Sequence, residues 1–378
     1  MKQFTLFFTI ITLSTGLLLF NACGSKESEN STSTNQDSTQ VNETSLLLEF
    51  TSKSGNVINS EQAPFTIGAD EVFEELSDIL VIDIRDTTDY FTGHIDGAIQ
   101  VAPNELPDYL EQKANVAAYK KVVLACYSGQ SSAYYATLLR LVGYSNVYTL
   151  RYGMAGWSKK MLPNKILDNL SNRYAGMLET TSNPNDRKYS FPMIKTGETT
   201  GYNILRSRVK TLFEEGFGKA HVKMDSVVQK LDQYFVVNYW PVEDYSKGHL
   251  PGSFQFTPKK SLAKDQLLTY LPTDKQILVY CTSGQTSAST VAYLRILGYN
   301  AISISFGTNG FSHGFTQANQ IKSFNTAENI ADYPMVEGKT PSLKMATTAI
   351  TTTTQTAEKE SAIPVVKKKK KAGGGGGC

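Results

Sequence analysis

The chain has 378 residues, enough for two domains of ordinary size together with terminal segments. Hydrophobic residues make up 40% of it and charged residues 19%, a composition able to bury substantial cores. The formal net charge of +2 does not favour nucleic acid as a partner. The four cysteines form no C-x-x-C pair and no Cys/His cluster at metal-ligand spacing, so we expect no disulfide scaffold, no metal and no cofactor.

Residues 1–22 have the layout of a secretory signal, with one Lys, an apolar stretch from Phe4 to Phe20 and a small Ala22 before Cys23. The apolar stretch contains Thr and Ser and is marginal for a hydrocarbon core of about 30 Å, so a retained anchor is the weaker alternative. The segment resembles a bacterial lipoprotein signal. That resemblance implies that Cys23 is acylated and that the protein is exported and anchored to a bacterial membrane, on its periplasmic or cell-surface side. An ordinary cleaved signal is another alternative.

Two terminal segments have compositions that cannot build a core. Residues 23–45 are polar and low in complexity, which predicts a flexible tether. Residues 317–378 are predicted to form a low-complexity tail that ends in five Lys, one Ala, five Gly and Cys378. We expect both segments to be disordered.

Strand and helix patterns alternate through the first half. Residues 72–78 have helical spacing, whereas 79–84 and 121–126 are continuous apolar runs typical of strands buried on both faces. Residues 132–144 carry apolar positions at helical spacing up to Gly143, and 146–150 read as a further strand. This alternation predicts an α/β fold with a parallel sheet flanked by helices.

The second half repeats the first at an offset of 155 residues. The matched positions are Val81/Val236, Asp89/Asp244, Tyr90/Tyr245, His94/His249, Gly97/Gly252, Gly129/Gly284, Arg140/Arg295 and Gly143/Gly298. We therefore expect two tandem domains, over residues 46–160 and 220–316. The intervening 161–219 are predicted to be a linker without a counterpart, containing an amphipathic helix over 203–217.

The repeated element is a strand that ends in Cys126 or Cys281, followed by a tight turn and a helix. Unpaired N–H groups at a helix N-terminus favour thiolate over thiol, and glycine lets the backbone bend around the sulfur. We take Cys126 and Cys281 as catalytic candidates, with a buried structural cysteine as the alternative. The substrate- or anion-binding candidates are the loop residues Tyr127, Ser128, Gly129, Gln130, Ser131, Thr282, Ser283, Gly284, Gln285 and Thr286.

Three sets of motifs resemble the rhodanese family in its tandem-domain form. They are "DIRDTTDYFTGHIDGA" with "NYWPVEDYSKGHLPGS", "CYSGQS" with "CTSGQT", and "YGMAGW" with "FGTNGF". The resemblance implies a sulfurtransferase, in which the loop cysteine takes a sulfane sulfur from a small donor, becomes a persulfide and passes the sulfur to a thiol or cyanide. Cys126 and Cys281 occupy that cysteine's position.

The second repeat departs from the family pattern, because Asn238 and Trp240 stand where the first keeps Asp83 and Arg85. We expect that pair to fix a strand end, so its loss concerns local packing rather than activity. His94 and His249, in Gly-His turns, are likewise interpreted as turn-fixing residues.

Both loops lack charged residues, whereas family members that favour thiosulfate typically carry Arg or Lys inside the loop. Thiosulfate therefore remains possible, but the sequence favours mercaptopyruvate-like, persulfide or polysulfide donors.

Two other functions compete with sulfur transfer. A tyrosine phosphatase also places a cysteine before a helix but needs Arg six positions later to grip the phosphoryl oxygens, where this chain has Ser132 and Ser287. A non-catalytic binding or sulfur-carrier module at the cell envelope is the alternative from another class, and the rate of thiol alkylation near neutral pH would separate it from an enzyme.

Cys378 lies at the end of a glycine arm that is similar to the swinging arms of some sulfur-oxidation carrier proteins. The similarity makes it a possible sulfur acceptor. A spare tail, an intermolecular disulfide or an attachment point is the simpler interpretation.

Overall fold

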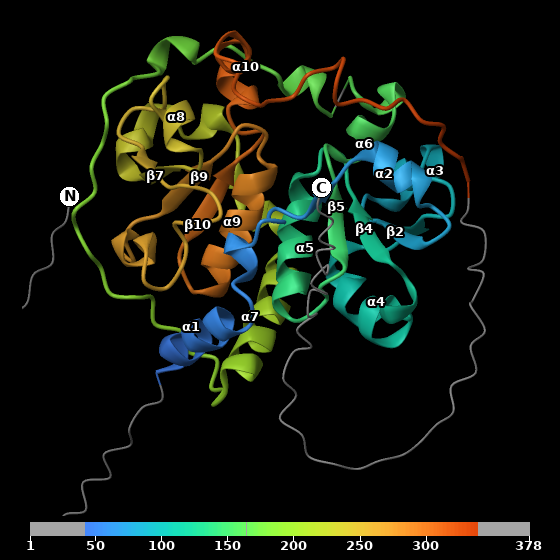
Figure 1. Ribbon diagram of the computed structural model, residues 1–378, viewed down its shortest axis with the longest axis horizontal. Coiled ribbons are helices and arrows are strands. Elements are labelled where there is room, and N and C mark those ends of the chain that lie inside the picture. Colours follow the sequence, from blue (N-terminus) through green and yellow to red (C-terminus); the bar gives the residue numbers. More distant parts are fainter. Residues whose placement is uncertain (1–41, 164, 339–378) are drawn as a thin grey trace, which may run out of the picture. The chain divides into compact units, whose positions relative to one another are not determined.

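A computed structural model describes residues 42–163 and 165–338, in which two five-stranded sheets form (Figure 1). The sheets have the strand orders β1-β5-β4-β2-β3 and β6-β10-β9-β7-β8, and every pairing is parallel. The predicted pair of parallel-sheet α/β domains is thus confirmed. Cys23 and Cys378 lie outside the described residues, as do nearly all of the predicted tether and the end of the predicted tail.

The two sheets are built from strands in equivalent order. The strands are β1 Thr66–Ile67, β2 Ile79–Asp83, β3 Ile99–Gln100, β4 Lys121–Ala125, β5 Val147–Leu150, β6 His221–Val222, β7 Phe235–Asn238, β8 Phe254–Gln255, β9 Ile277–Tyr280 and β10 Ala301–Ile304. The helices are α1 Glu43–Lys53, α2 Ala69–Glu74, α3 Thr87–Thr92, α4 Leu106–Gln112, α5 Gln130–Leu141, α6 Gly153–Trp157, α7 Gly201–Glu215, α8 Val242–Tyr245, α9 Gln285–Ile296 and α10 Asn309–Ala318. In the described part of the chain, none of these helices is long and apolar enough to cross a membrane.

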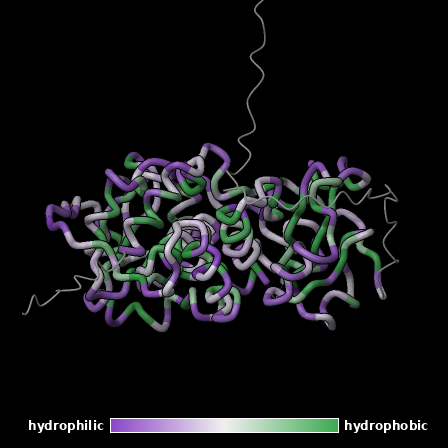
Figure 2. The backbone as a smooth tube through the Cα atoms, turned by 90° about the horizontal axis from the view of Figure 1, so that it is seen from below, coloured by the Kyte–Doolittle hydropathy of each residue, from purple (hydrophilic) through white to green (hydrophobic). Residues whose placement is uncertain are grey.

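The central strands form where the sequence has its continuous apolar runs. Strand β2 is buried along its whole length, and Val81 lies opposite Val123 of β4. Segments of hydrophobic residues lie inside the fold, and segments of hydrophilic residues lie toward its surface (Figure 2). Helices on both faces of a parallel sheet leave no solvated face, which is why these strands do not alternate.

Helices α5 and α9 pack against each other and join the two domains. One apolar cluster includes Leu138 of α5 and Val291 of α9, so part of the core is shared between the domains. The hydroxyls of Thr137 and Ser289 are 2.7 Å apart across this contact. The helices that follow the two cysteine loops are therefore direct neighbours.

A buried ion pair fixes the end of β2. Asp83 and Arg85 are fully buried, with 2.6 Å between Asp83 Oδ2 and Arg85 Nη2. Arg85 Nη2 also donates to the carbonyl oxygen of Gly93 at 2.7 Å, which ties the strand end to the following turn. The predicted structural role of this pair agrees with these contacts.

An aromatic arrangement takes the place of that ion pair in the second domain. The Trp240 and Tyr280 rings meet edge to face with their centroids 5.8 Å apart. The Tyr280 hydroxyl accepts the N–H of Leu250 at 2.9 Å, and so reaches the turn that Arg85 reaches in the first domain. Tyr280 is the counterpart of the small Ala125, so the two domains differ at three positions of this site.

The two predicted turn histidines are buried and bond to backbone. Each ring stacks on the tyrosine four residues earlier, and its Nδ1 lies 2.9 Å from the carbonyl oxygen of Tyr90 for His94 and 2.8 Å from that of Tyr245 for His249. Their backbones pair with distant segments: His94 bridges to Val336 and His249 to Glu179.

Those two bridges reveal a second pair of equivalent segments. Residues 171–179 follow the first domain but bond to the second, whereas residues 331–336 follow the second domain but bond to the first. An early part of the predicted linker thus resembles the segment after the second domain in crossing to the other domain. The predicted amphipathic helix in the later part of the linker is confirmed as α7.

The predicted C-terminal tail begins too early. Residues 317–338 pack into the fold: Ile321 is buried in the second domain, Phe324 is buried against Tyr152, and Trp157 Nε1 donates to the carbonyl oxygen of Pro334 at 3.0 Å. Isolated aromatic residues anchor this segment without forming a periodic pattern, so composition alone does not reveal it.

The predicted tether likewise extends a few residues too far. Helix α1 starts at Glu43, because the Asn42 side chain caps it by accepting the N–H of Ser45 at 3.0 Å. Leu47 and Leu48 then bury one face of the helix in the shared core. Cap residues are polar, and so they share the composition of the preceding segment.

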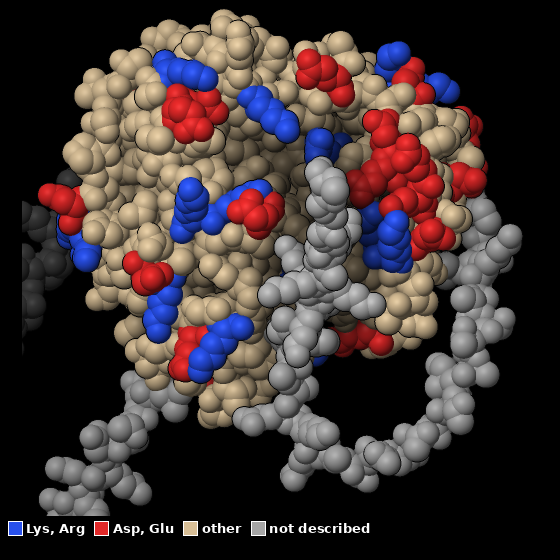
Figure 3. Space-filling view, in the orientation of Figure 1, with Lys and Arg blue, Asp and Glu red and all other residues tan. Residues whose placement is uncertain are grey.

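Charged side chains of both signs are scattered over the face shown in Figure 3. Acidic side chains gather over α2, where Glu71 and Glu75 pair with Lys121 and Glu75 also pairs with Lys120. Among the described residues, this face displays no continuous basic surface of the kind that binds nucleic acid.

Candidate active site

Cys126 follows the last residue of β4 and is 2% exposed. Its Sγ accepts the N–H of Gly129 at 3.1 Å and lies 3.3 Å from Ser132 Oγ. Ser132 is in turn hydrogen-bonded to Thr149 of β5. The sulfur therefore sits at the N-terminus of α5, held by one backbone donor and one hydroxyl.

Cys281 occupies the same position after β9. Its Sγ accepts N–H groups from Gly284 at 3.2 Å and Ser287 at 3.3 Å, and Ser287 Oγ lies 3.5 Å away. The Ser287 hydroxyl also lies 2.7 Å from Ser303 Oγ of β10. Each sulfur thus accepts at least one backbone N–H, a contact that stabilises negative charge, while its thiol donates to the serine hydroxyl.

Ser132 and Ser287 are functional candidates that sequence reasoning missed. They lie six positions after the cysteines, at the positions where a tyrosine phosphatase would need Arg. Two hydroxyls of the predicted substrate- or anion-binding loops, those of Ser128 and Ser283, accept bonds from the Nε2 atoms of Gln130 and Gln285. The sequence signal that could have identified Ser132 and Ser287 is that a Ser stands six positions after the cysteine in both repeats.

Two glycine turns hold each loop in place. Gly129 and Gly284 have φ of +83° and +82°, a region that favours glycine. A Cβ at Gly153 or Gly307 would collide with the carbonyl oxygen of Cys126 or Cys281. This close approach explains why glycine recurs in the segments after β5 and β10.

The rhodanese-like domain model matches residues 69–160 and 225–313 of the chain. Among curated proteins, the thiosulfate sulfurtransferase GlpE of Pseudomonas fluorescens is 40% identical over 78 residues, covering 21% of this chain and 69% of that protein. The GlpE of Tolumonas auensis is 31% identical over 83 residues, 22% of this chain and 76% of the relative. The chain belongs to the rhodanese family. The solved thiosulfate sulfurtransferase of Pseudomonas aeruginosa is 20% identical, with a TM-score of 0.26, and is matched over 70% of this chain and 48% of its own.

The two rhodanese loops differ in what surrounds them. The Tyr127 hydroxyl donates to Asp86 Oδ2 at 2.5 Å, and Lys165 Nζ lies 3.9 Å from the centre of the Tyr127 ring. The hydrogen bond from Tyr127 lowers the pKa of the Asp86 carboxyl, while burial raises the pKa of Tyr127. Thr282 stands at the position of Tyr127 in the second loop, so the hydrogen bond from Tyr127 to Asp86 is a feature of the first domain.

A pocket of about 360 Å³ opens beside Cys281 and is lined by both rhodanese domains. The charged residues that line it outside the loop are Arg151 from the first domain, Lys259 and Asp244 from the second and Lys322 from the C-terminal segment. Lys259 Nζ also lies 3.4 Å from Glu61 Oε2. Tyr152 lines it as well, and burial raises the pKa of Tyr152 to about 12, so its hydroxyl stays protonated near neutral pH. The uncharged second loop therefore shares its pocket with charged side chains from segments distant in the sequence.

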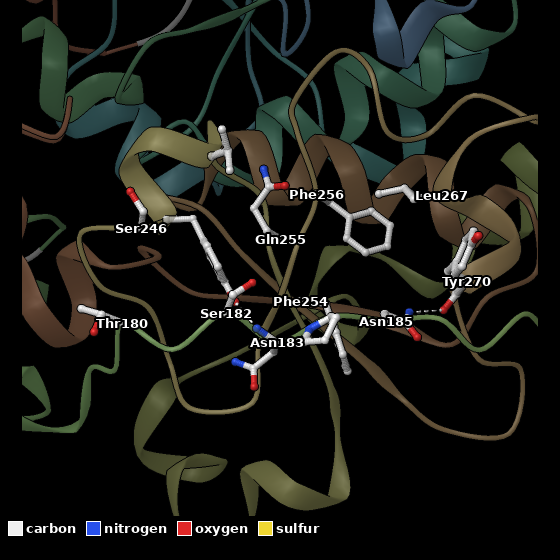
Figure 4. Close-up of a pocket in the computed structure, with 13 residues that line it drawn as sticks. Thr180, Ser182, Asn183, Asn185, Ser246, Phe254, Gln255, Phe256, Leu267 and Tyr270 are labelled. Atoms are coloured by element: carbon white, nitrogen blue, oxygen red, sulfur yellow. Dashed lines mark hydrogen bonds between the residues drawn. The ribbon is translucent and has the colours of Figure 1, made fainter.

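A separate cavity of about 440 Å³ lies in the second rhodanese domain (Figure 4). Asn183 and Asn185 of the linker face Phe254, Gln255 and Tyr270 across it, and Asn185 Nδ2 donates to the carbonyl oxygen of Tyr270 at 2.9 Å. Its lining contains neither cysteine nor any charged residue. Cys126 and Cys281 thus lie in the loops and do not line this cavity.

Proposed function

We propose that this chain is a sulfurtransferase in which Cys126 and Cys281 carry sulfane sulfur as persulfides. The observation that carries the proposal is the position of each Sγ, which accepts a glycine N–H at the N-terminus of a helix. Preorganised N–H donors stabilise a thiolate, which is the nucleophilic form of cysteine.

The transfer proceeds in two displacements. The cysteine thiolate attacks the sulfane sulfur of the donor, a new S–S bond forms, and the electron pair leaves with the rest of the donor, as sulfite when the donor is thiosulfate. An acceptor thiolate or cyanide then attacks the outer sulfur of the persulfide and releases the cysteine thiolate. Each step moves one sulfur atom and one electron pair, so no external oxidant or reductant is consumed.

The donor in this proposal is an anion, and the pocket beside Cys281 supports that choice. Arg151, Lys259 and Lys322 line the same pocket as Cys281 and outnumber Asp244 there. Thiosulfate, mercaptopyruvate and polysulfide all carry negative charge, so the neutral loop no longer favours one over another. Opposite charge in a cleft also raises the local concentration of an anionic substrate.

The proposal is tested by the intact mass of the protein after incubation with thiosulfate, mercaptopyruvate or polysulfide. We expect a gain of about 32 Da per persulfide, located by peptide mapping on Cys126 and Cys281. Sulfur that moves on to Cys378 would identify that cysteine as an acceptor. Absence of the gain with all three donors, despite fast alkylation of the loop cysteines, would instead favour a binding module.

Export and lipidation at Cys23 complete the proposal. We expect a fatty-acid probe to label the wild-type protein, because the residues before Cys23 have the layout of a lipoprotein signal. Cys23→Ser should lose the label and release the protein from membranes, and Cys378→Ser is the matched control that should keep both. Label that persists in Cys23→Ser contradicts this assignment.

A further inference from the structure

The glutamine of each cysteine loop reaches into the other rhodanese domain. Gln130 Oε1 accepts the N–H of Phe306 at 2.7 Å, and Gln285 Oε1 accepts the N–H of Tyr152 at 3.1 Å. Both glutamines are the first residues of their helices, 6% and 3% exposed. The contact is reciprocal, so two hydrogen bonds cross between the domains in opposite directions.

Each crossing bond ends on the backbone that holds the other domain's cysteine. Tyr152 directly precedes Gly153 and Met154, and the Met154 N–H donates to the carbonyl oxygen of Cys126 at 2.7 Å. In the same way Phe306 precedes the segment in which the Thr308 N–H donates to the carbonyl oxygen of Cys281 at 2.9 Å. Each glutamine thus accepts a backbone N–H of the other domain, and the N–H two residues later donates to the carbonyl oxygen of that domain's cysteine.

The glutamine oxygens also lie against the glycines that bind the sulfurs. A Cβ at Gly129 would lie 2.5 Å from Gln285 Oε1, and one at Gly284 would collide with Gln130 Oε1. The N–H groups of these glycines are the donors to Cys126 Sγ and Cys281 Sγ. Movement of either glutamine would consequently disturb the peptide that positions the opposite sulfur.

The other end of each amide stays in its own loop. Gln130 Nε2 donates to Ser128 Oγ at 3.0 Å, and Gln285 Nε2 donates to Ser283 Oγ at 3.3 Å. Each amide thus has both its donor and its acceptor engaged while buried, which fixes its orientation. Neither loop can complete this arrangement without the other domain.

We propose that Gln285 is a positioning residue for Cys126 and that Gln130 is a positioning residue for Cys281. The assignment is crossed: each glutamine acts mainly on the cysteine of the other domain, by fixing the backbone and the glycine that hold its sulfur. The proposal rests on the proposed function only in that the two cysteines react as thiolates. It makes the paired domains, and not the single rhodanese domain, the unit in which either loop reaches its reactive geometry.

The test measures alkylation of each cysteine by iodoacetamide as a function of pH, with peptide mass resolving the two sites. Gln285→Met keeps the length of the side chain and removes the crossing bond. We expect it to slow alkylation of Cys126 near neutral pH by about three- to tenfold, the range of one net hydrogen bond, and to move its pH profile to higher pH. Gln130→Met should have the same effect on Cys281.

Two controls separate positioning from loosened structure. Ser128→Ala and Ser283→Ala remove the partner of the same amide within its own loop and leave the crossing bond, so they should not give the crossed pattern. Thermal unfolding of every variant checks that the domains stay paired. Equal slowing of both cysteines, slowing confined to a variant's own loop, or unchanged rates would each overturn the proposal. Cysteines that alkylate in the crossed pattern but never gain sulfur would contradict the sulfurtransferase function alone.

Discussion

Replacing both Cys126 and Cys281 with Ser should lower sulfur transfer by on the order of a thousandfold or more, because no other described residue lies where the attacking sulfur lies. Serine is close in size to cysteine, and its hydroxyl can still accept the N–H of Gly129 or Gly284. What it lacks is a thiolate near neutral pH, without which the S–S bond to the donor cannot form.

The measurement is turnover with thiosulfate as donor and cyanide as acceptor, followed by thiocyanate formation. Each single variant should keep part of the activity, because the other loop retains its own cysteine, glycine and serine. Circular dichroism and thermal unfolding of the double variant verify that its fold is intact. Undiminished turnover in a folded double variant would refute the proposed mechanism.

The relative activities of the two single variants also distinguish the loops. Cys281 lines a pocket whose charged residues outside the loop are Arg151, Lys259, Lys322 and Asp244, whereas Tyr127 beside Cys126 is bonded to Asp86. We therefore expect Cys126→Ser, which keeps Cys281, to transfer sulfur from anionic donors faster than Cys281→Ser does.

Much of the fold was accessible from the sequence because its signals are local. The continuous apolar runs of β2 and β4, and the helical spacing ending at Gly143, depend only on neighbouring residues. The duplication then doubled every signal, so that the position of Cys281 could be inferred from that of Cys126.

The remaining features depend on contacts between residues far apart in the chain. Nothing near Gln130 indicates that its side chain meets Phe306, 176 positions later. Arg151 likewise approaches Cys281 only because α5 and α9 bring the two domains together. The segment with Phe324 packs through single aromatic residues, which carry no periodicity. These features depend on contacts between residues far apart in the chain, and a pattern of neighbouring residues cannot reveal such contacts.

The second large effect concerns stability, at the ion pair that ends β2. Arg85→Ala should lower the free energy of unfolding by about 3–5 kcal/mol, the usual cost of leaving one buried charge without its partner. Asp83 has no exposed surface, and Arg85 also holds the carbonyl oxygen of Gly93. The carboxylate cannot reach water unless the strand end opens.

The second domain supplies the matched control, since it fills the same site with Asn238, Trp240 and Tyr280. The triple variant Asp83→Asn, Arg85→Trp, Ala125→Tyr transplants that arrangement into the first domain. It should lose less stability than Arg85→Ala, because it buries no unpaired charge and restores a hydroxyl that reaches the turn after α3.

Urea unfolding followed by tryptophan fluorescence measures both variants. The chain has two tryptophans, Trp157 in the first domain and Trp240 in the second, so a Trp240→Phe background makes Trp157 report the first domain for Arg85→Ala. The triple variant adds a tryptophan and is compared by circular dichroism instead. A loss below about 1 kcal/mol for Arg85→Ala would show that the ion pair is dispensable and that the strand end is held by its backbone bonds. A loss in the expected range, recovered in part by the triple variant, would mean that the aromatic set of the second domain replaced the ion pair without weakening the loop that follows it.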